Sequence, residues 1–147
     1  MKVVIQRVKK SSVKVDDKIV GEIKKGFCVL VGFTQDDTLE DIRYIVNKIV
    51  NLRVFDDENG VMNKSILETN GEILSISQFT LYANTKKGNR PSYIKALNGE
   101  EAIKLYEEFN CKLQEFVTTK TGIFGADMEV EIINDGPITI CVDSKEK

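Results

Sequence analysis

The chain has 147 residues, a formal net charge of −2 and no histidine, and 41% of its residues are hydrophobic while 30% are charged. This length suits one domain with its own core, and this balance excludes a disordered or fibrous protein. The longest apolar run, residues 27–33, is far shorter than the roughly 20 residues that span a bilayer, so the sequence predicts no membrane segment.

The N-terminal third predicts a meander of short, mostly antiparallel strands. Apolar alternation and turn signals place these strands at residues 2–8, 12–16, 18–23 and 27–33. The first residues alternate as a strand does and lack the apolar core of a signal peptide, so we expect a cytoplasmic protein. The three cysteines are widely spaced and odd in number, which fits a reducing compartment and argues against a disulfide framework or a zinc site.

Two helices are predicted from apolar residues at helical spacing. The first begins after Thr38, which stands with Asp41 in capping-box positions, and its apolar stripe reaches Val50. The second begins near Asn98 or Gly99. Its apolar face carries Ala102, Leu105, Tyr106, Phe109, Leu113 and Phe116.

Further strands are predicted between and after the helices. Residues 52–55 look extended before a turn at residues 56–60, and residues 72–82 form the central strand. Residues 127–132 alternate again, and a turn containing Gly136-Pro137 then interrupts two strand-like runs. The sequence therefore predicts a single α+β domain over residues 1–147, with a mostly antiparallel sheet or partly closed barrel and two main helices packed on it.

The central strand carries polar groups at its far end, in Ser77-Gln78-Phe79-Thr80. Side chains alternate along a strand, so these groups fall on both faces of a run whose composition favours burial. Buried polar groups need hydrogen-bond partners, and these are therefore either satisfied within the core or presented to a ligand. A second polar run, residues 134–139, contains the predicted Gly-Pro turn.

The absence of histidine removes several familiar kinds of site. A Ser-His-Asp or Cys-His arrangement and a histidine-based metal site are excluded. Neither a dinucleotide-binding glycine motif nor a P-loop occurs, so we expect no nucleotide cofactor and no metal. Residues 56–58 are acidic, but three acids before Asn59-Gly60 are more typical of an exposed turn than of a catalytic or metal site.

The two polar runs together resemble the D-aminoacyl-tRNA deacylase, or D-tyrosyl-tRNA deacylase, family. Its hallmarks are a Ser-Gln-Phe-Thr segment and an Asn-x-Gly-Pro-x-Thr segment, which here are residues 77–80 and 134–139. The resemblance covers essentially the whole chain and includes three further segments. These are residues 4–8, 88–92 and 122–128. Tyr93 and Ile138 depart from the Phe and Val of the family, and neither changes a polar atom of the site.

The resemblance implies a homodimer with an active site at each subunit interface. It also implies that the Gly136-Pro137 bond is cis and enters the partner's pocket, where its carbonyl oxygens hold the α-amino group of the substrate so that an L side chain would clash. The implied reaction is hydrolysis of D-aminoacyl-tRNA, bound by its acceptor 3′ end, to a free D-amino acid and tRNA. Glycine lacks the distinguishing side chain, so glycine-mischarged tRNA is a further candidate substrate.

Residue roles follow from the same resemblance. Backbone N–H groups of Phe79 and Thr80 are the candidates for polarising the ester, while Ser77 and Gln78 are expected to bind the adenosine end. The residues expected to line or support the pocket are Ala102, Phe124 and Met128. Arg7 is expected to brace the Gly-Pro loop. Because the ester is already activated and the terminal ribose offers a 2′-hydroxyl, positioning matters more than a protein base, and hydrolysis is expected to be RNA-assisted.

Two other functions stay open. A non-catalytic nucleic-acid-binding module could use the same pocket for a 3′ end, against which stand a pI near 5.3 and no dense basic stripe. A hydrolase with Thr80 as nucleophile is the third alternative, although no residue is an evident base for it. The best local candidate for phosphate contacts is the loop of residues 86–90, with Lys95 nearby; most loops of this kind are simply solvated.

Overall fold

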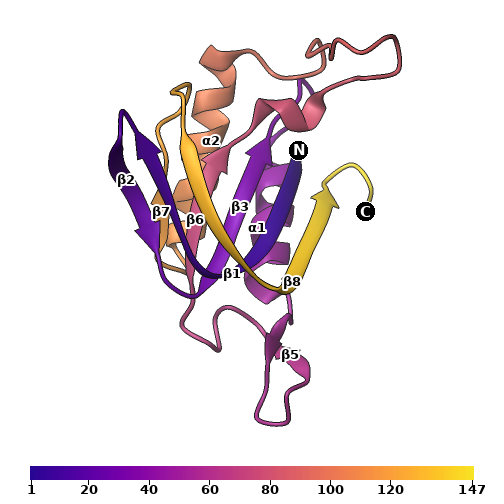
Figure 1. The fold of residues 1–147 in the computed structure, drawn as a ribbon. Helices are drawn as coiled ribbons and strands as arrows, with labels where there is room; N and C mark the ends of the chain where they lie inside the picture. The colour runs from indigo at the N-terminus through magenta and orange to yellow at the C-terminus, as the bar shows by residue number, and fades with distance from the viewer.

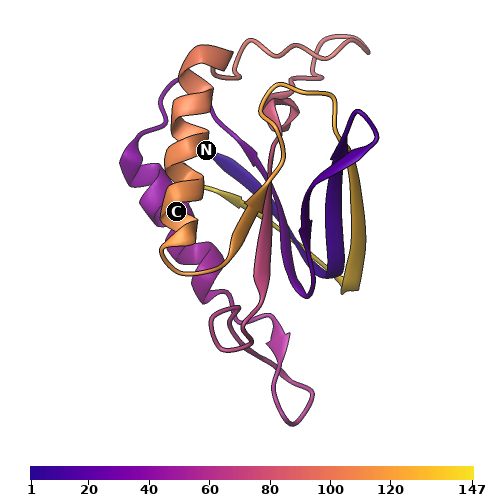
Figure 2. The ribbon, with the colours of Figure 1, turned by 90° about the vertical axis from the view of Figure 1, so that its left-hand side faces the viewer.

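All residues from 1 to 147 are described by a computed structural model, in which two helices cover one side of a curved sheet (Figures 1 and 2). The elements are β1 (Lys2–Val15), β2 (Lys18–Ile23), β3 (Gly26–Gly32), α1 (Leu39–Asn51), β4 (Phe55–Asp56), β5 (Met62–Lys64), β6 (Glu72–Ser77), a 3₁₀ turn η1 (Phe79–Tyr82), α2 (Gly99–Gln114), β7 (Thr119–Thr121) and β8 (Glu129–Asp143). Neither helix combines the length and the apolarity needed to cross a membrane. The α+β class and the two packed helices are confirmed.

The sheet is built around β1, which pairs antiparallel with β2, β3 and β8. β2 pairs with the second half of β1, where Ser11 faces Ile23. β3 pairs with the first half of β1, where Val8 faces Gly26. The predicted meander is therefore wrong about which strands are neighbours, because a meander would place β3 beside β2, whereas β3 pairs with β1. The predicted strands 2–8 and 12–16 are one strand, since β8 continues to pair with β1 through its polar middle, where Lys10 faces Ile133.

The other half of the sheet is parallel, with β6 paired to β3 and β7 paired to β6. Parallel neighbours need long crossover connections, and α1 and α2 lie in those two connections. The sheet curls until β2 approaches β7, so that a Cβ atom on Gly21 would lie 2.7 Å from the Thr121 carbonyl oxygen. The partly closed barrel is thus confirmed, with antiparallel pairs around β1 and parallel pairs beyond β3.

Apolar side chains form two cores, because neighbouring residues of β6 point to opposite faces of the sheet. Ile73 joins the larger core between sheet and helices, where Phe27 and Phe109 are fully buried. Leu74 joins the smaller core, which also contains Cys28. Burial raises the pKa of the Cys28 thiol to about 11, so this cysteine is a protonated packing residue at neutral pH.

The predicted strand over residues 72–82 is too long. β6 ends at Ser77, which faces Val31 of β3, and the Gln78 N–H then donates to the Val31 carbonyl at 2.7 Å before the chain turns into η1. Gly32 leaves room for this turn, since a Cβ atom there would lie 2.8 Å from the Gln78 carbonyl oxygen. The polar residues after Ser77 therefore do not follow the alternation of a strand.

Both predicted helix starts are confirmed. The Asp41 carboxylate accepts hydrogen bonds from the Thr38 N–H at 2.9 Å and from the Thr38 hydroxyl at 3.1 Å. At α2, the Asn98 side chain accepts from the Glu101 N–H at 3.1 Å. Burial opposes the ionisation of Asp41, but hydrogen bonds from Ser144, Thr38 and Lys145 outweigh it and hold the pKa of this carboxyl well below its usual range.

We predict that Asp41→Asn lowers the free energy of unfolding by about 1 kcal/mol at pH 7, as the loss of a helix cap does. Because the pKa of Asp41 is depressed in the folded state, its contribution is complete above the unfolded-state pKa of about 4 and is lost as the pH falls through the folded-state value. Urea unfolding of the unmodified protein and of Asp41→Asn at pH 7, 5 and 3 measures how the stability difference depends on pH.

The matched control is Glu40→Gln, which removes a charge from the same helical turn at a side chain that is 83% exposed. It should change stability less than Asp41→Asn at pH 7. A stability difference between Asp41→Asn and the unmodified protein that is the same at pH 7 and pH 3 would contradict the prediction.

Candidate functional site

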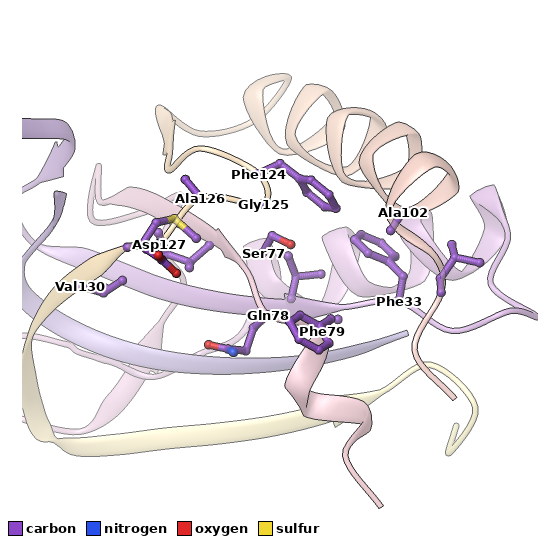
Figure 3. A pocket seen from close by; sticks show the side chains of 16 residues that line it. Phe33, Ser77, Gln78, Phe79, Ala102, Phe124, Gly125, Ala126, Asp127 and Val130 are labelled. Carbon is purple, nitrogen blue, oxygen red and sulfur yellow. The ribbon is translucent and has the colours of Figure 1, made fainter. Parts of the chain in front are cut away.

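A cavity of about 480 Å³ opens where β3 and β6 end (Figure 3). The two strands are parallel, so their carboxyl ends lie at the same edge of the sheet. The cavity is lined by residues from these two strand ends, from the start of α2 and from the segment that leads into β8. Segments far apart in the sequence therefore supply one site.

Six residues predicted for the site line this cavity. They are Ser77, Gln78, Phe79, Ala102, Phe124 and Met128. Figure 3 shows Ser77, Phe79, Ala102 and Phe124 around the same space, on β6, η1, α2 and the segment before β8. The two predicted polar residues of this group are half-buried at the end of β6, which leaves them accessible from the cavity.

Thr80 lies beside the cavity and does not line it. Its hydroxyl accepts a hydrogen bond from the Gln78 amide at 2.5 Å. The backbone N–H groups of Phe79 and Thr80 are the first of η1, and the first N–H groups of a helical turn find no acceptor within that turn. At this end of β6 the chain thus presents backbone donors, while the Thr80 hydroxyl is held by a neighbouring side chain.

The second polar run forms a bulge in the middle of β8. Gln6 of β1 faces Thr139 of β8, and Lys10 faces Ile133. Between these two pairs, β1 has three residues, 7–9, whereas β8 has five, 134–138. The predicted turn is therefore wrong in one respect: β8 is one strand with two extra residues. The Gly136-Pro137 bond is cis, and both residues are exposed and line no part of the cavity.

Asn134 and Arg7 hold this bulge at its base. The Asn134 side-chain amide donates to the Arg7 carbonyl at 2.9 Å and to the Ile138 carbonyl at 3.1 Å, which ties the two ends of the bulge to β1. The Arg7 guanidinium donates to the Asp135 carbonyl at 3.3 Å and to the Val54 carbonyl at 2.5 Å. Arg7 is buried, and the Asp135 carboxylate 3.3 Å away compensates its charge.

The cavity offers few groups that can transfer a proton. Asp127, which is exposed, is the only ionisable side chain that lines it. Behind Phe124, Tyr106 packs with a ring separation of 5.7 Å and donates its hydroxyl proton to the Ser75 carbonyl at 2.8 Å. Burial raises the pKa of Tyr106, so it stays a hydrogen-bond donor. The structure contains no group of three or more His, Cys, Asp or Glu side chains that could hold a metal ion.

Sequence reasoning missed the cavity wall supplied by the end of β3, with Gly32, and by Phe33 directly after it, and it also missed Asp127. The run at residues 27–33 is apolar throughout, so no signal in it separates core residues from residues that face a cavity. Asp127 stands inside the segment 122–128 that contributed to the family resemblance, and that motif was the available signal.

Comparison with known sequences gives full-length matches. A family model described as D-Tyr-tRNA(Tyr) deacylase matches residues 4–143. A D-aminoacyl-tRNA deacylase of Clostridium novyi is 59% identical over 149 residues, which covers 100% of this chain and 99% of that protein. A protein of the same name from Bacteroides fragilis is 60% identical over 151 residues, with the same coverage.

Two solved structures share the fold. The c-Myc DNA Unwinding Element Binding Protein superposes with a TM-score of 0.93 at 42% identity, covering 97% of this chain and 98% of that one. A probable eukaryotic D-amino acid tRNA deacylase superposes with a TM-score of 0.82 at 18% identity, covering 96% of this chain and 97% of that one. The second likeness bears on the fold alone.

Proposed function

Because this chain belongs to the D-Tyr-tRNA(Tyr) deacylase family and is a hydrolase of that family, we propose that it proofreads translation in the cytoplasm by removing D-amino acids from mischarged tRNA. The observation that carries the proposal is the cavity at the ends of β3 and β6. It gathers Ser77, Gln78 and Phe79 with apolar residues from α2 and from the segment before β8. Such a mixture of apolar walls and a few polar groups suits a nucleoside ester.

The proposed chemistry is hydrolysis of the ester that joins the amino acid to the 3′-oxygen of the terminal adenosine. Water attacks the ester carbonyl carbon, the bond from that carbon to the 3′-oxygen breaks, and the 3′-oxygen takes a proton. The backbone N–H groups of Phe79 and Thr80 stabilise the developing oxyanion, and Ser77 and Gln78 bind the adenosine. The neighbouring 2′-hydroxyl of the substrate assists the water.

The position of the Thr80 hydroxyl favours this chemistry over a threonine nucleophile. The hydroxyl is bonded to the Gln78 amide, an N–H donor that cannot take a proton from it. The cavity also lacks histidine and is lined by one carboxylate only, that of Asp127. Substrate-assisted hydrolysis needs no base from the protein, which suits these surroundings.

We infer that selection against L-amino acids uses the bulge of a partner subunit in a homodimer. In support, Gly136 and Pro137 are exposed on the bulge and do not line the cavity of their own chain. Arg7 and Asn134 fix the base of the bulge, which keeps its carbonyl oxygens in place. These oxygens would hold the substrate's α-amino group so that an L side chain meets the bulge, whereas glycine would be admitted.

Non-catalytic nucleic-acid binding is the second candidate function. The solved relative with a TM-score of 0.93 is named as a DNA unwinding element binding protein. Against this function for the present chain stands its sequence pI of about 5.3, because non-specific nucleic-acid binding relies on basic surface. Salt-sensitive binding of uncharged strands without ester cleavage would favour this candidate.

We predict that the protein releases D-tyrosine from D-Tyr-tRNA at least about 100-fold faster than L-tyrosine from L-Tyr-tRNA, a difference of about 2.7 kcal/mol. Glycine should be released from glycyl-tRNA, because it lacks the side chain that clashes. Release of labelled amino acid under identical conditions measures all three rates. Equal rates on the two tyrosyl substrates, or no release from either, would refute the function.

We predict that Thr80→Ala keeps deacylation of D-Tyr-tRNA within about tenfold, while a 2′-deoxy terminal adenosine lowers the rate at least about 1,000-fold, the size of a lost acid–base contribution. Single-turnover rates on the two substrates measure both effects. Thr80→Ser is the control for loss of the methyl group. If Thr80→Ala abolishes hydrolysis and the 2′-deoxy substrate is cleaved normally, Thr80 is the nucleophile.

We predict that two inactive variants regain activity when mixed and allowed to exchange subunits. One variant carries Ala102→Trp, which fills the cavity. The other lacks Gly136 and Pro137, a deletion that leaves three residues of β8 opposite residues 7–9 and so allows regular pairing. Random exchange gives half heterodimers with one intact site each, so about a quarter of the original activity should return. No recovery despite proven exchange would place the bulge and cavity in the same subunit.

A further inference from the structure

An exposed loop rises beside the cavity, between η1 and α2 (Figures 1 and 2). Its base is fixed. Asn84 and Ser92 exchange two backbone hydrogen bonds of 2.8 and 2.9 Å, and the Leu97 N–H donates to the Phe33 carbonyl at 3.0 Å. Phe33 and Leu97 both line the cavity, so the loop is attached to the cavity wall. We call residues 84–95 the basic loop, for the charges described next.

The basic loop concentrates positive charge in an acidic chain. No acidic residue occurs from Ile73 to Gly99, although the chain has 23, whereas this stretch contains Lys86, Lys87, Arg90 and Lys95. A net charge of −2 with +4 in this stretch leaves −6 for the rest of the chain. The four side chains belong to exposed residues, and none is within ion-pair distance of a carboxylate.

Exposed apolar side chains connect the basic loop to the cavity. Tyr93 is 40% exposed and Ile94 is 78% exposed. The centroids of the Tyr93 and Phe79 rings lie 5.1 Å apart in an edge-to-face arrangement with an angle of 70° between the planes, and Phe79 lines the cavity. An aromatic surface thus continues from the cavity mouth onto a loop that carries four unpaired cations.

We propose that the basic loop binds the acceptor strand of the tRNA outside the cavity, with its cations on backbone phosphates and Tyr93 stacked on a base near the terminal adenosine. This inference rests on the proposed function, and it says where the part of the tRNA that does not fit in the cavity is bound. A positively charged surface beside exposed aromatic side chains is an arrangement that binds a single nucleic-acid strand, because the cations contact phosphates and the rings stack on bases. The exposed aromatic surface favours a nucleic-acid strand over a single phosphate ion as the ligand, because a phosphate ion has no base to stack on a ring.

Contacts between the basic loop and the acceptor strand would explain how a cavity of about 480 Å³ can serve a macromolecular substrate. A space of this size suits a drug-sized ligand, such as one aminoacylated nucleoside, so the remaining affinity for tRNA has to come from outside it. The loop should therefore affect the reaction of aminoacyl-tRNA and leave that of an aminoacyl-adenosine unchanged.

The test compares D-Tyr-tRNA with D-tyrosyl-adenosine as substrates of Lys86→Gln combined with Lys87→Gln. We expect kcat/KM for the tRNA substrate to fall about tenfold and its dependence on salt to weaken, since each lost phosphate contact removes about 0.7 to 0.9 from the slope of log affinity against log salt. The value for D-tyrosyl-adenosine should change less than about twofold, because the variant leaves the cavity intact. Arg43→Gln combined with Lys48→Gln, on the exposed side of α1, removes the same charge elsewhere and should have little effect on either substrate.

Stacking is tested separately with Tyr93→Ala and Tyr93→Phe. Loss of the ring should lower kcat/KM for D-Tyr-tRNA about tenfold, within the range for a lost base–aromatic stack, while Tyr93→Phe keeps the ring and should retain activity. Circular dichroism and thermal unfolding verify that each variant is folded. Cleavage of D-tyrosyl-adenosine provides a second check on the cavity.

Three outcomes would overturn the inference: no effect of the lysine variant on the tRNA substrate, equal losses on both substrates, or an equal loss in the α1 control. Equal losses would mean that the loop acts only by shaping the cavity. The proposed function fails in a different way, because the unmodified protein would then cleave neither substrate.

Discussion

Parallel pairing of β3 with β6 is the constraint on which the functional site depends. Parallel strands end at the same edge of a sheet, so the last residues of β3 and the polar end of β6 meet although more than forty residues separate them in the chain. Gly32 then sets the exit of β6, because the absent side chain leaves space for the Gln78 carbonyl. The resulting turn presents backbone N–H groups beside the cavity instead of a further stretch of strand.

A second constraint acts through the long pairing of β1 with β8. Two extra residues in β8 cannot be absorbed by a regular ladder, so they project from the sheet as the Gly136-Pro137 bulge. The Asn134 side chain donates to the Arg7 carbonyl of β1 and to the Ile138 carbonyl at the other end of the bulge, and the Arg7 guanidinium reaches from the bulge to the Val54 carbonyl. A projecting backbone held in this way is a fixed shape, which is what the proposed discrimination by steric exclusion requires.

The distribution of charge separates the two parts of the proposed substrate. The cavity is lined by one ionisable side chain, Asp127, and by apolar walls, which suits an aminoacylated nucleoside. The unpaired cations lie outside, on the basic loop, where a phosphate backbone can meet them in solvent. A chain that is acidic overall can therefore still act on tRNA, because electrostatic attraction depends on local charge more than on the net value.

Much of this protein was determined by its sequence alone. Helical spacing and capping residues predicted α1 and α2, since both signals are local: the Asp41 and Asn98 side chains bond backbone groups within three residues. The lack of histidine limited the chemistry, the two polar motifs indicated the family, and the family resemblance pointed to six of the sixteen residues that line the cavity. Local hydrogen bonds and motif order are properties of the chain and do not depend on which strands meet.

Tertiary structure alone decided the pairing of β3 with β1 and β6, the end of β6 at Ser77, and the bulge within β8. Each of these results from contacts between residues distant in the sequence, and alternation within a strand carries no information about its neighbour. The same reason explains why Gly32 and Phe33 were read as ordinary strand residues. Only the fold shows that they face a cavity.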